Sequence, residues 1–342
     1  MNESRMNKLL KALVYNEKVN MKPQSRFEEY LLSMINGESV DDFPLSQSEY
    51  YLKELSIVTA QLKEFVIASI ERTEKSGQWP NDICDKLTRI GDAASMLNFY
   101  LTELNLPNVE YIGMMAFGMC MGLSKVTAPK LKTVGAQAFV QTGITTFNAP
   151  ELIEIGEQAF RGTTIATIDF PKVTTVGQYA FESCQAIQTV NWPNVKTIGQ
   201  NCFEYCSNLS TVHLPQLTRV SYACFAQCPL IEELKFDSAT STEINALRDI
   251  PNLKRVEFGS KVAFGGRAFG DDMKLEAVIL RYSGNDGICT LASDTFADCG
   301  IEAGTGYVYV PFALIDAYKT DARFSKYVEQ IRTIEDYPEI SG

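Results

Sequence analysis

Few residues of this sequence could carry out acid–base, nucleophilic or metal chemistry. The 342-residue chain contains a single histidine, His213, together with nine cysteines. Catalysis by a Ser-His-Asp or Cys-His arrangement would have to use His213, and a metal site with several histidine ligands is excluded. His213 lies within Thr211-Val-His-Leu-Pro215, whose alternation of polar and apolar residues is typical of a strand with one exposed face. We therefore interpret His213 as a surface residue.

The cysteines and carboxylates are also weak signals for a reactive site. The pairs Cys202/Cys206 and Cys224/Cys228 have C-x-x-x-C spacing, whereas metal and redox pairs usually have C-x-x-C, and no second histidine is available. Adjacent carboxylates such as Glu232/Glu233 are more typical of a solvated surface than of a tuned acid–base pair. The sequence therefore predicts a protein that is not an enzyme and that binds no metal or cofactor.

The charge balance argues against several classes of partner. With 31 basic and 42 acidic residues, the chain has a formal charge of −11 and no basic run, which disfavours nucleic acid and anionic membrane surfaces. No apolar run approaches the roughly 20 residues of a membrane helix, so membrane insertion is not expected. Lys8, Lys11, Glu17 and Lys18 interrupt the N-terminal segment, which therefore lacks the apolar core of a classical signal peptide.

The elements that position these residues are set by a repeat of 21 or 22 residues. Prolines such as Pro193 and glycines such as Gly199 each recur with the same spacing of 21 or 22 residues. The position 22 residues after Phe225 and 22 before Phe269 holds Leu247, which marks one degenerate copy. The phenylalanines that define the repeat are Phe117, Phe139, Phe160, Phe181, Phe203, Phe225 and Phe269.

Each copy predicts one turn of a solenoid. The clearest copy, residues 187–207, contains a short alternating strand that ends at Pro193, because proline cannot donate to a strand ladder. A single copy buries too little apolar surface to offset its conformational entropy, so neighbouring copies must stack. We expect an α+β protein in which residues 98–311 form a solenoid of about nine coils with one parallel β-sheet. A helical cap over residues 312–342, including a helix from Phe312 to Tyr327, covers its end.

The repeat explains most of the cysteines. Five of them lie three residues after the phenylalanine position, in a column that also contains Thr142 and Thr163. Cys202 and Cys224 lie just before the phenylalanine. Buried free cysteine packs as a small apolar residue, so the sequence predicts two interior columns of small side chains.

Residues 101–311 resemble the BspA-like class of bacterial leucine-rich repeats. The resemblance rests on the pairs Leu-Pro, Ile-Gly and Ala-Phe and on the cysteine, which recur at equivalent positions of the repeat. The tail around Val308-Tyr-Val-Pro311 and Ala317-Tyr318-Lys319 is similar to the usual C-terminal cap of that family. The resemblance implies an open solenoid used for binding and adhesion, without enzymatic activity. The copy with Leu247 departs from the pattern and also has Glu243 in place of glycine.

Residues 1–97 predict a small all-α domain for attachment or oligomerisation. Ser25 with Glu28, and Ser46 with Glu49, form capping boxes, and we expect helices near 4–17, 25–36, 46–76 and 81–97. These Pro-x-Ser-x-x-Glu segments resemble N-terminal segments of phage and prophage tail-region proteins from gut bacteria. The third helix has apolar residues at coiled-coil spacing, which fits either packing on its neighbours or a homo-oligomeric seam. The residues of that seam are Tyr51, Leu55, Val58, Leu62 and Phe65.

The remaining candidate site is the outward face of the predicted sheet, which we expect to be concave. Two outward columns, which continue to Ala277 and Ile279, are rich in Thr and Asn in the middle coils and charged in the later ones. A ladder of hydroxyl and amide groups could bind an extended glycan or peptide, although Thr also simply suits exposed strand positions. The candidate ligand-binding residues are Lys125, Thr127, Thr146, Asn148, Thr167, Asp169, Thr189, Asn191, Thr211, His213, Glu233 and Lys235.

These observations predict a non-enzymatic recognition module. We expect a phage virion or tail-associated protein that recognises a protein or glycan on a bacterial surface. The alternatives are a bacterial cell-surface adhesin, or a structural virion or scaffold protein with protein partners only. A hydrolase is the least favoured class.

Overall fold

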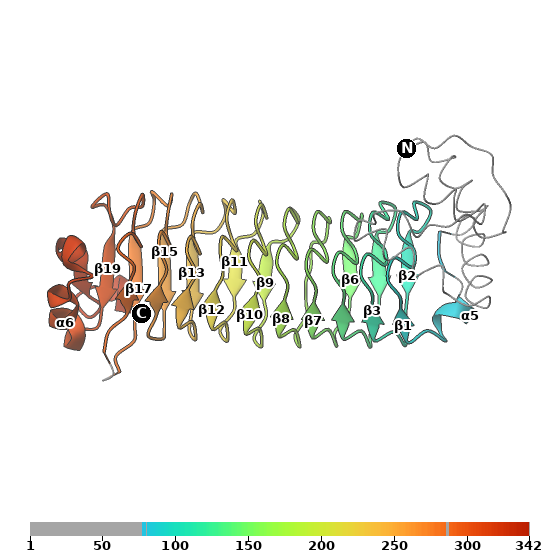
Figure 1. Cartoon of the computed structure of the whole chain (residues 1–342), viewed down its shortest axis with the longest axis horizontal. Coiled ribbons are helices and arrows are strands. Elements are labelled where there is room, and N and C mark those ends of the chain that lie inside the picture. Colours follow the sequence, from blue (N-terminus) through green and yellow to red (C-terminus); the bar gives the residue numbers. More distant parts are fainter. Residues whose placement is uncertain (1–76, 80, 285–286, 342) are drawn as a thin grey trace, which may run out of the picture. The chain divides into compact units, whose positions relative to one another are not determined.

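The chain divides into two units, residues 1–76 and 77–342. The computed structural model describes residues 77–79, 81–284 and 287–341, which are the coloured part of Figure 1. The helices predicted over 4–17, 25–36 and 46–76, and the seam from Tyr51 to Phe65, lie outside the described residues.

The second unit is a parallel β-solenoid of about eleven turns whose coils follow one another in a nearly straight row (Figure 1). One side, here called the long-strand face, has strands of three or four residues, and the other, the short-strand face, has strands of two. All strand pairs are parallel, and equivalent residues of successive copies pair in register, as Thr189 does with Thr211. The predicted fold of residues 98–311 is confirmed in its main feature.

The long-strand face contains β2 (Glu103–Asn105), β4 (Lys125–Thr127), β6 (Thr146–Asn148), β9 (Thr189–Asn191), β11 (Thr211–His213), β13 (Glu233–Phe236), β15 (Arg255–Phe258), β17 (Ala277–Leu280), β19 (Tyr307–Val310) and β20 (Ile331–Thr333). The short-strand face contains β1 (Arg89–Ile90), β3 (Tyr111–Ile112), β5 (Thr133–Val134), β7 (Glu154–Ile155), β8 (Thr175–Val176), β10 (Thr197–Ile198), β12 (Arg219–Val220), β14 (Ser241–Thr242), β16 (Ala263–Phe264) and β18 (Thr290–Leu291).

The solenoid begins earlier than the sequence predicts. The expected helix over 81–97 is wrong: only α5 (Asn81–Cys84) is helical, and β1 pairs in register with β3. Ile90-Gly91 repeats the pattern of Ile112-Gly113, but Ser95 stands where the later coils have phenylalanine, so this first coil lacks the strongest repeat signal. The ring of Trp79, 5.4 Å from that of Phe117, covers the first aromatic layer instead.

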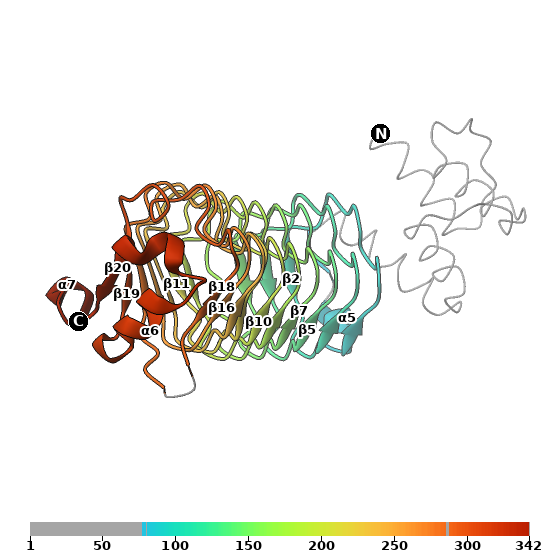
Figure 2. The same ribbon diagram turned by 60° about the vertical axis from the view of Figure 1, so that its left-hand side comes forward.

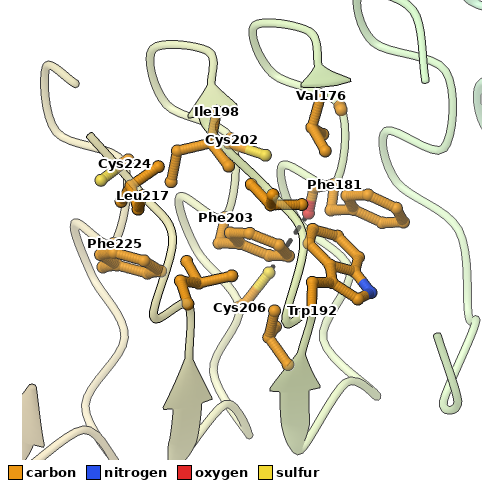
Figure 3. Close-up of a cluster of buried hydrophobic side chains, with 14 of the residues drawn as sticks. Val176, Phe181, Trp192, Ile198, Cys202, Phe203, Cys206, Leu217, Cys224 and Phe225 are labelled. Carbon is orange, nitrogen blue, oxygen red and sulfur yellow. Dashed lines mark hydrogen bonds between the residues drawn. The ribbon is translucent and has the colours of Figure 1, made fainter. Parts of the chain in front are cut away.

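A stack of phenylalanine rings runs through the core. From Phe117 to Phe225 each ring lies nearly parallel to the next, with centroids 5.2–5.9 Å apart and interplanar angles of 4–11°. Figure 3 shows Phe181, Phe203 and Phe225 from three successive coils. Leu247 is fully buried in the degenerate copy, and the stack resumes between Phe269 and Phe296 at 5.4 Å. The predicted column is therefore confirmed, with Leu247 as its aliphatic member.

The backbone around each phenylalanine alternates between ordinary and left-handed conformations. Gln137 and Gln141, two residues before and after Phe139, have φ values of 55° and 52°. Such values strain a residue with a side chain. Here the backbone N–H groups of Gln137, Phe139 and Gln141 all donate to carbonyls of the next coil at 2.7–2.8 Å. The same arrangement recurs along the solenoid, so the strain is offset by three hydrogen bonds between successive coils.

The glycine column marks the closest approach of successive coils. A Cβ atom on Gly177 would lie 2.5 Å from the backbone N of Glu157 and 2.6 Å from the carbonyl carbon of Gly156. Backbone atoms cannot move aside as a side chain can, so these coils require glycine at this position. Glycine at the predicted turn is therefore required by the close packing of successive coils as well as by the conformation of the turn.

Residues 312–341 cover the last coil in several short pieces. The expected single helix from Phe312 to Tyr327 is wrong. The chain forms a 3-10 turn (Phe312–Leu314), α6 (Ile315–Thr320), a second 3-10 segment (Ser325–Gln330), β20 and α7 (Pro338–Ser341). Asp321 ends α6 in an extended conformation. The buried ring of Tyr327 lies edge-on to Phe296 at 5.1 Å, so this segment does cover the end of the core (Figure 2).

Candidate binding face

The twelve candidate residues share one side of the solenoid. All lie on the long-strand face, at outward positions of β4, β6, β9, β11 and β13 or, for Thr167 and Asp169, in the segment between β6 and β9 that forms no strand. Eleven side chains are exposed and Thr127 is half-buried. The coils follow a nearly straight line in Figure 1, so this face is not the inner side of a horseshoe, contrary to the concave surface that the sequence suggested.

Most of these side chains have no partner within the described residues. The hydroxyl groups of Thr146, Thr167, Thr189 and Thr211 make no hydrogen bond there. The adjacent hydroxyl column behaves differently, because Thr145 donates to the carbonyl of Ser124 at 3.2 Å, as its counterparts do in other coils. Two neighbouring columns of hydroxyl groups therefore differ: one binds the preceding coil, and the other is available to a ligand.

The charged side chains at the β13–β17 end of the face form ion pairs with one another. Glu257 forms ion pairs with Lys235 at 3.2 Å and with Arg281 at 2.8 Å. Burial opposes ionisation of Glu257, but hydrogen bonds from Arg281 and Lys235 outweigh it and lower the pKa of that carboxyl group. The hydrogen bond to Glu257 in turn raises the pKa of Lys235. Lys235 is therefore less available to a ligand than the residues from Lys125 to His213.

The C-terminal segment covers the face beyond β13. Arg255 donates to the carbonyl of Glu339 at 3.0 Å, and Arg281 donates to that of Ile340 at 2.6 Å. The side chain of Ile340 belongs to a small apolar cluster that buries Ala277 and Ile279. The outward columns that the sequence extends to these two residues are therefore open only as far as β13.

Two hollows interrupt the same face, and neither was predicted from the sequence. The larger, of about 580 Å³, lies between β11 and β13 and includes Leu230, Glu233 and Lys235 in its lining. A smaller one of about 240 Å³ lies at the first coils, beside Gln78 and Trp79. The available signal for the larger hollow was a change of repeat type after Pro215, because the next coils have Phe236-Asp237, Phe258-Gly259 and Leu280-Arg281 where the earlier coils have proline after the strand.

The cysteine columns are confirmed as interior packing. All nine cysteines are buried and none forms a disulfide within the described residues. The thiol of Cys206 donates to the carbonyl of Phe181 at 3.2 Å, across to the preceding coil (Figure 3). Burial raises the pKa of the Cys184 thiol to about 11 and that of Cys206 well above its usual value. These thiols are therefore neutral, and in the described part of the chain no three His, Cys, Asp or Glu side chains are grouped to hold a metal ion.

One member of the cysteine column is a buried carboxyl group. Asp272 occupies the position three residues after Phe269 and is 1% exposed. Its Oδ1 accepts the backbone N–H of Ile250 at 2.7 Å, whereas Oδ2 has no partner. Burial, followed by the charges of Asp249 and Asp271, raises the pKa of this carboxyl group well above its usual value, although the Ile250 N–H and Arg248 act in the opposite direction.

We expect Asp272→Asn to stabilise the protein at neutral and alkaline pH by about 1–3 kcal/mol. The folded state holds the Asp272 proton more tightly than the unfolded state, whose carboxyl group ionises near pH 4. The stabilising effect of that proton is therefore complete below pH 4 and is lost as the pH rises toward the folded pKa. Urea unfolding of both proteins from pH 4 to 8 measures this difference, and parallel stability curves would contradict the assignment.

Comparison with known proteins identifies the repeat. Residues 88–206 and 174–302 match the BspA type leucine-rich repeat region, in six copies. The chain belongs to the BspA-type leucine-rich repeat family. The match spans more than half of the sequence and confirms the family resemblance of the repeats up to residue 302. It starts within the first coil, which was not predicted from the sequence. Phage tail-region proteins are not part of this finding, so that resemblance stays a prediction.

Several solved structures of bacterial proteins are similar to this BspA-type chain. A leucine-rich repeat protein from Bacteroides ovatus is 18% identical, with a TM-score of 0.42, and the match covers 66% of this chain and 70% of that chain. The pneumococcal vaccine antigen PcpA is 17% identical, with a TM-score of 0.40 and coverage of 72% and 70%. A leucine-rich cell surface protein from Faecalibacterium prausnitzii is 17% identical, with a TM-score of 0.33 and coverage of 72% and 83%. No curated protein sequence matches the chain.

None of the helices between residues 77 and 341 that the structure describes has the length and apolarity to cross a membrane.

Proposed function

We propose that this protein is a non-enzymatic binding and adhesion module. Its long-strand face from β4 to β13 contacts an extended ligand on a bacterial surface. The observation that carries the proposal is the row of exposed hydroxyl, amide and charged side chains, from Lys125 to His213, that have no partner within the described residues. Strand spacing places equivalent groups about 4.8 Å apart along the solenoid, which suits the repeating units of an extended polymer.

The proposed location is the bacterial cell surface. Membership of the BspA-type family supports this location, and the similar protein from Faecalibacterium prausnitzii is itself a cell surface protein. A phage virion is the alternative that follows from the Pro-x-Ser-x-x-Glu segments of residues 1–76, and a structural scaffold is the alternative without a host ligand. Antibody labelling of intact cells and of phage particles separates the three, because a scaffold within the particle is not labelled from outside.

We expect a triple substitution of Thr146, Thr167 and Thr189 by Glu to weaken binding of the full chain to intact bacterial cells by about tenfold or more, because larger, charged side chains would replace the hydroxyl groups that face the ligand. The matched control replaces Thr133, Thr175 and Thr197 by Glu on the short-strand face. This control changes the net charge equally. Binding is measured by sedimentation of the cells with labelled protein. Equal binding by the two triple variants, or no binding by the natural chain, would reject the proposed function.

A further inference from the structure

The long-strand face is split between β11 and β13. No backbone hydrogen bond joins these two strands in the described structure, although β11 pairs with β9 and β13 pairs with β15. In the next coil the N–H groups of Lys254 and Arg255 both donate to the carbonyl of Glu232, at 2.8 and 3.1 Å. The equivalent N–H groups of Glu232 and Glu233 make no such bond to Ser210. Backbone donors and an acceptor therefore lack partners on the two sides of this split.

The split coincides with a change in the repeat. Every coil from Leu106-Pro107 to Leu214-Pro215 has proline at the equivalent position, whereas the next coils have Phe236-Asp237 and Phe258-Gly259 there. The strands accordingly lengthen from three residues in β11 to four in β13. β13 pairs in register with β15, and the rings of Phe236 and Phe258 stack at 5.5 Å. The larger hollow, here called the β11–β13 groove, therefore lies at the point where the repeat changes.

The groove over this split exposes apolar side chains that are buried elsewhere. Val212 is half-buried, whereas the equivalent residues Val190 and Leu234 are 0% and 2% exposed. Leu230 lies at the rim with 51% of its surface exposed. A ligand in this groove of about 580 Å³ would therefore bury aliphatic surface against both strands.

The charge that remains available in the groove is negative. Glu232 pairs with Lys254 at 2.8 Å, and Lys235 and Arg255 both pair with Glu257. The carboxylate of Glu233 is exposed and has no partner within the described residues. The groove therefore complements a positive charge next to an aliphatic group.

We propose that the β11–β13 groove binds an extended peptide segment of a protein partner, in which a lysine or arginine lies next to an aliphatic residue. The aliphatic side chain packs on Val212 and Leu230, the basic side chain pairs with Glu233, and the peptide amides meet the unpaired backbone groups. This proposal deepens the proposed function and rests on it. A glycan fits the groove less well, because no Phe, Tyr or Trp side chain lines it as a platform for a sugar ring.

The test uses the full chain on an array of peptides of about ten residues, long enough to span the strands. Central positions carry Lys, Arg, Glu or Ser beside Leu or Val, and an array of bacterial oligosaccharides is probed in parallel. Glu233→Lys and Leu230→Ser alter the groove. The matched controls are Glu154→Lys on β7 and Ile244→Ser, whose side chains are also exposed. Circular dichroism establishes that all four variants are folded.

We expect the natural chain to bind peptides with Lys or Arg beside Leu or Val, and Glu233→Lys to weaken this binding by about tenfold. Peptides with a central Glu should then bind the Glu233→Lys variant, whereas both controls should behave as the natural chain does. Hydrogen exchange of the free protein should be faster at Glu232 and Glu233 than at Lys254 and Arg255, and the peptide should slow it.

Several results would overturn the proposal. These are the absence of peptide binding, peptide binding that the groove variants do not change, or binding of oligosaccharides that Glu233→Lys abolishes. The cell-binding assay with the threonine variants is scored separately. Cell binding that is sensitive to those variants but not to Glu233→Lys would remove the groove proposal and leave the proposed function standing.

Discussion

Replacing Phe203 by alanine should lower the free energy of unfolding by about 3–5 kcal/mol, the usual cost of emptying a buried phenylalanine site. Phe203 is fully buried, and its ring stacks on those of Phe181 and Phe225 at 5.4 and 5.9 Å. The cavity would interrupt two ring contacts, and the rigid stacking of coils leaves little room for collapse. Urea unfolding followed by circular dichroism measures the change.

Two controls separate the loss of packing from other effects. Phe203→Leu should cost only about 1 kcal/mol, since Leu247 shows that this column accommodates leucine. Phe312→Ala, the same substitution at a side chain that is 66% exposed, should change stability by no more than about 0.5 kcal/mol. Equal urea midpoints for Phe203→Ala and Phe312→Ala would show that the ring stack does not stabilise the solenoid.

Tyr318→Ala should be comparably severe, with a loss of about 3–5 kcal/mol that is confined to the C-terminal coils. Tyr318 is fully buried, its ring lies edge-on to Phe324 at 5.0 Å, and its hydroxyl group accepts the backbone N–H of Cys289 at 3.1 Å. Removing the side chain both opens a cavity beneath α6 and leaves a buried N–H without an acceptor. Hydrogen exchange measured coil by coil locates the loss.

The conservative variant Tyr318→Phe isolates the hydrogen bond. It should cost about 1–3 kcal/mol, because only the partner of the buried Cys289 N–H is lost. Tyr205→Phe, at a side chain that is 49% exposed, provides the matched control and should be nearly neutral. Faster exchange throughout the solenoid in Tyr318→Ala, rather than near its end, would refute a local capping role.

The repeat made the interior of this protein predictable from its sequence. The same environment recurs in every coil, so Phe181, Cys206 and Thr189 each occupy a column whose other members identify its role. Periodicity thus predicted the ring stack, the buried thiols and the outward row of hydroxyl groups. It failed at Ser95, where the first coil lacks its phenylalanine, and a helix was expected instead.

Features that depend on contacts between distant segments could not be predicted in this way. The C-terminal segment covers β17 through bonds such as that from Arg281 to Ile340, which no local pattern specifies. The left-handed backbone at Gln137 and Gln141 has no glycine signal and depends on hydrogen bonds to the next coil. The change from Leu214-Pro215 to Phe236-Asp237 was visible in the sequence, but its effect on pairing follows only from the positions of both strands.

The interrupted pairing around β11 also has a mechanical consequence. Hydrogen bonds between coils point along the solenoid axis, so tension between its two ends loads every joint in series. The coil that carries β11 and β12 lacks a strand ladder to β13 on one face and to β10 on the other. Under tension, the joints of this coil and of the coil between β6 and β9, which forms no strand on the long-strand face, would yield before the coils that are paired on both faces. A protein held to a surface by one block of coils could then lengthen at these joints without unfolding the rest.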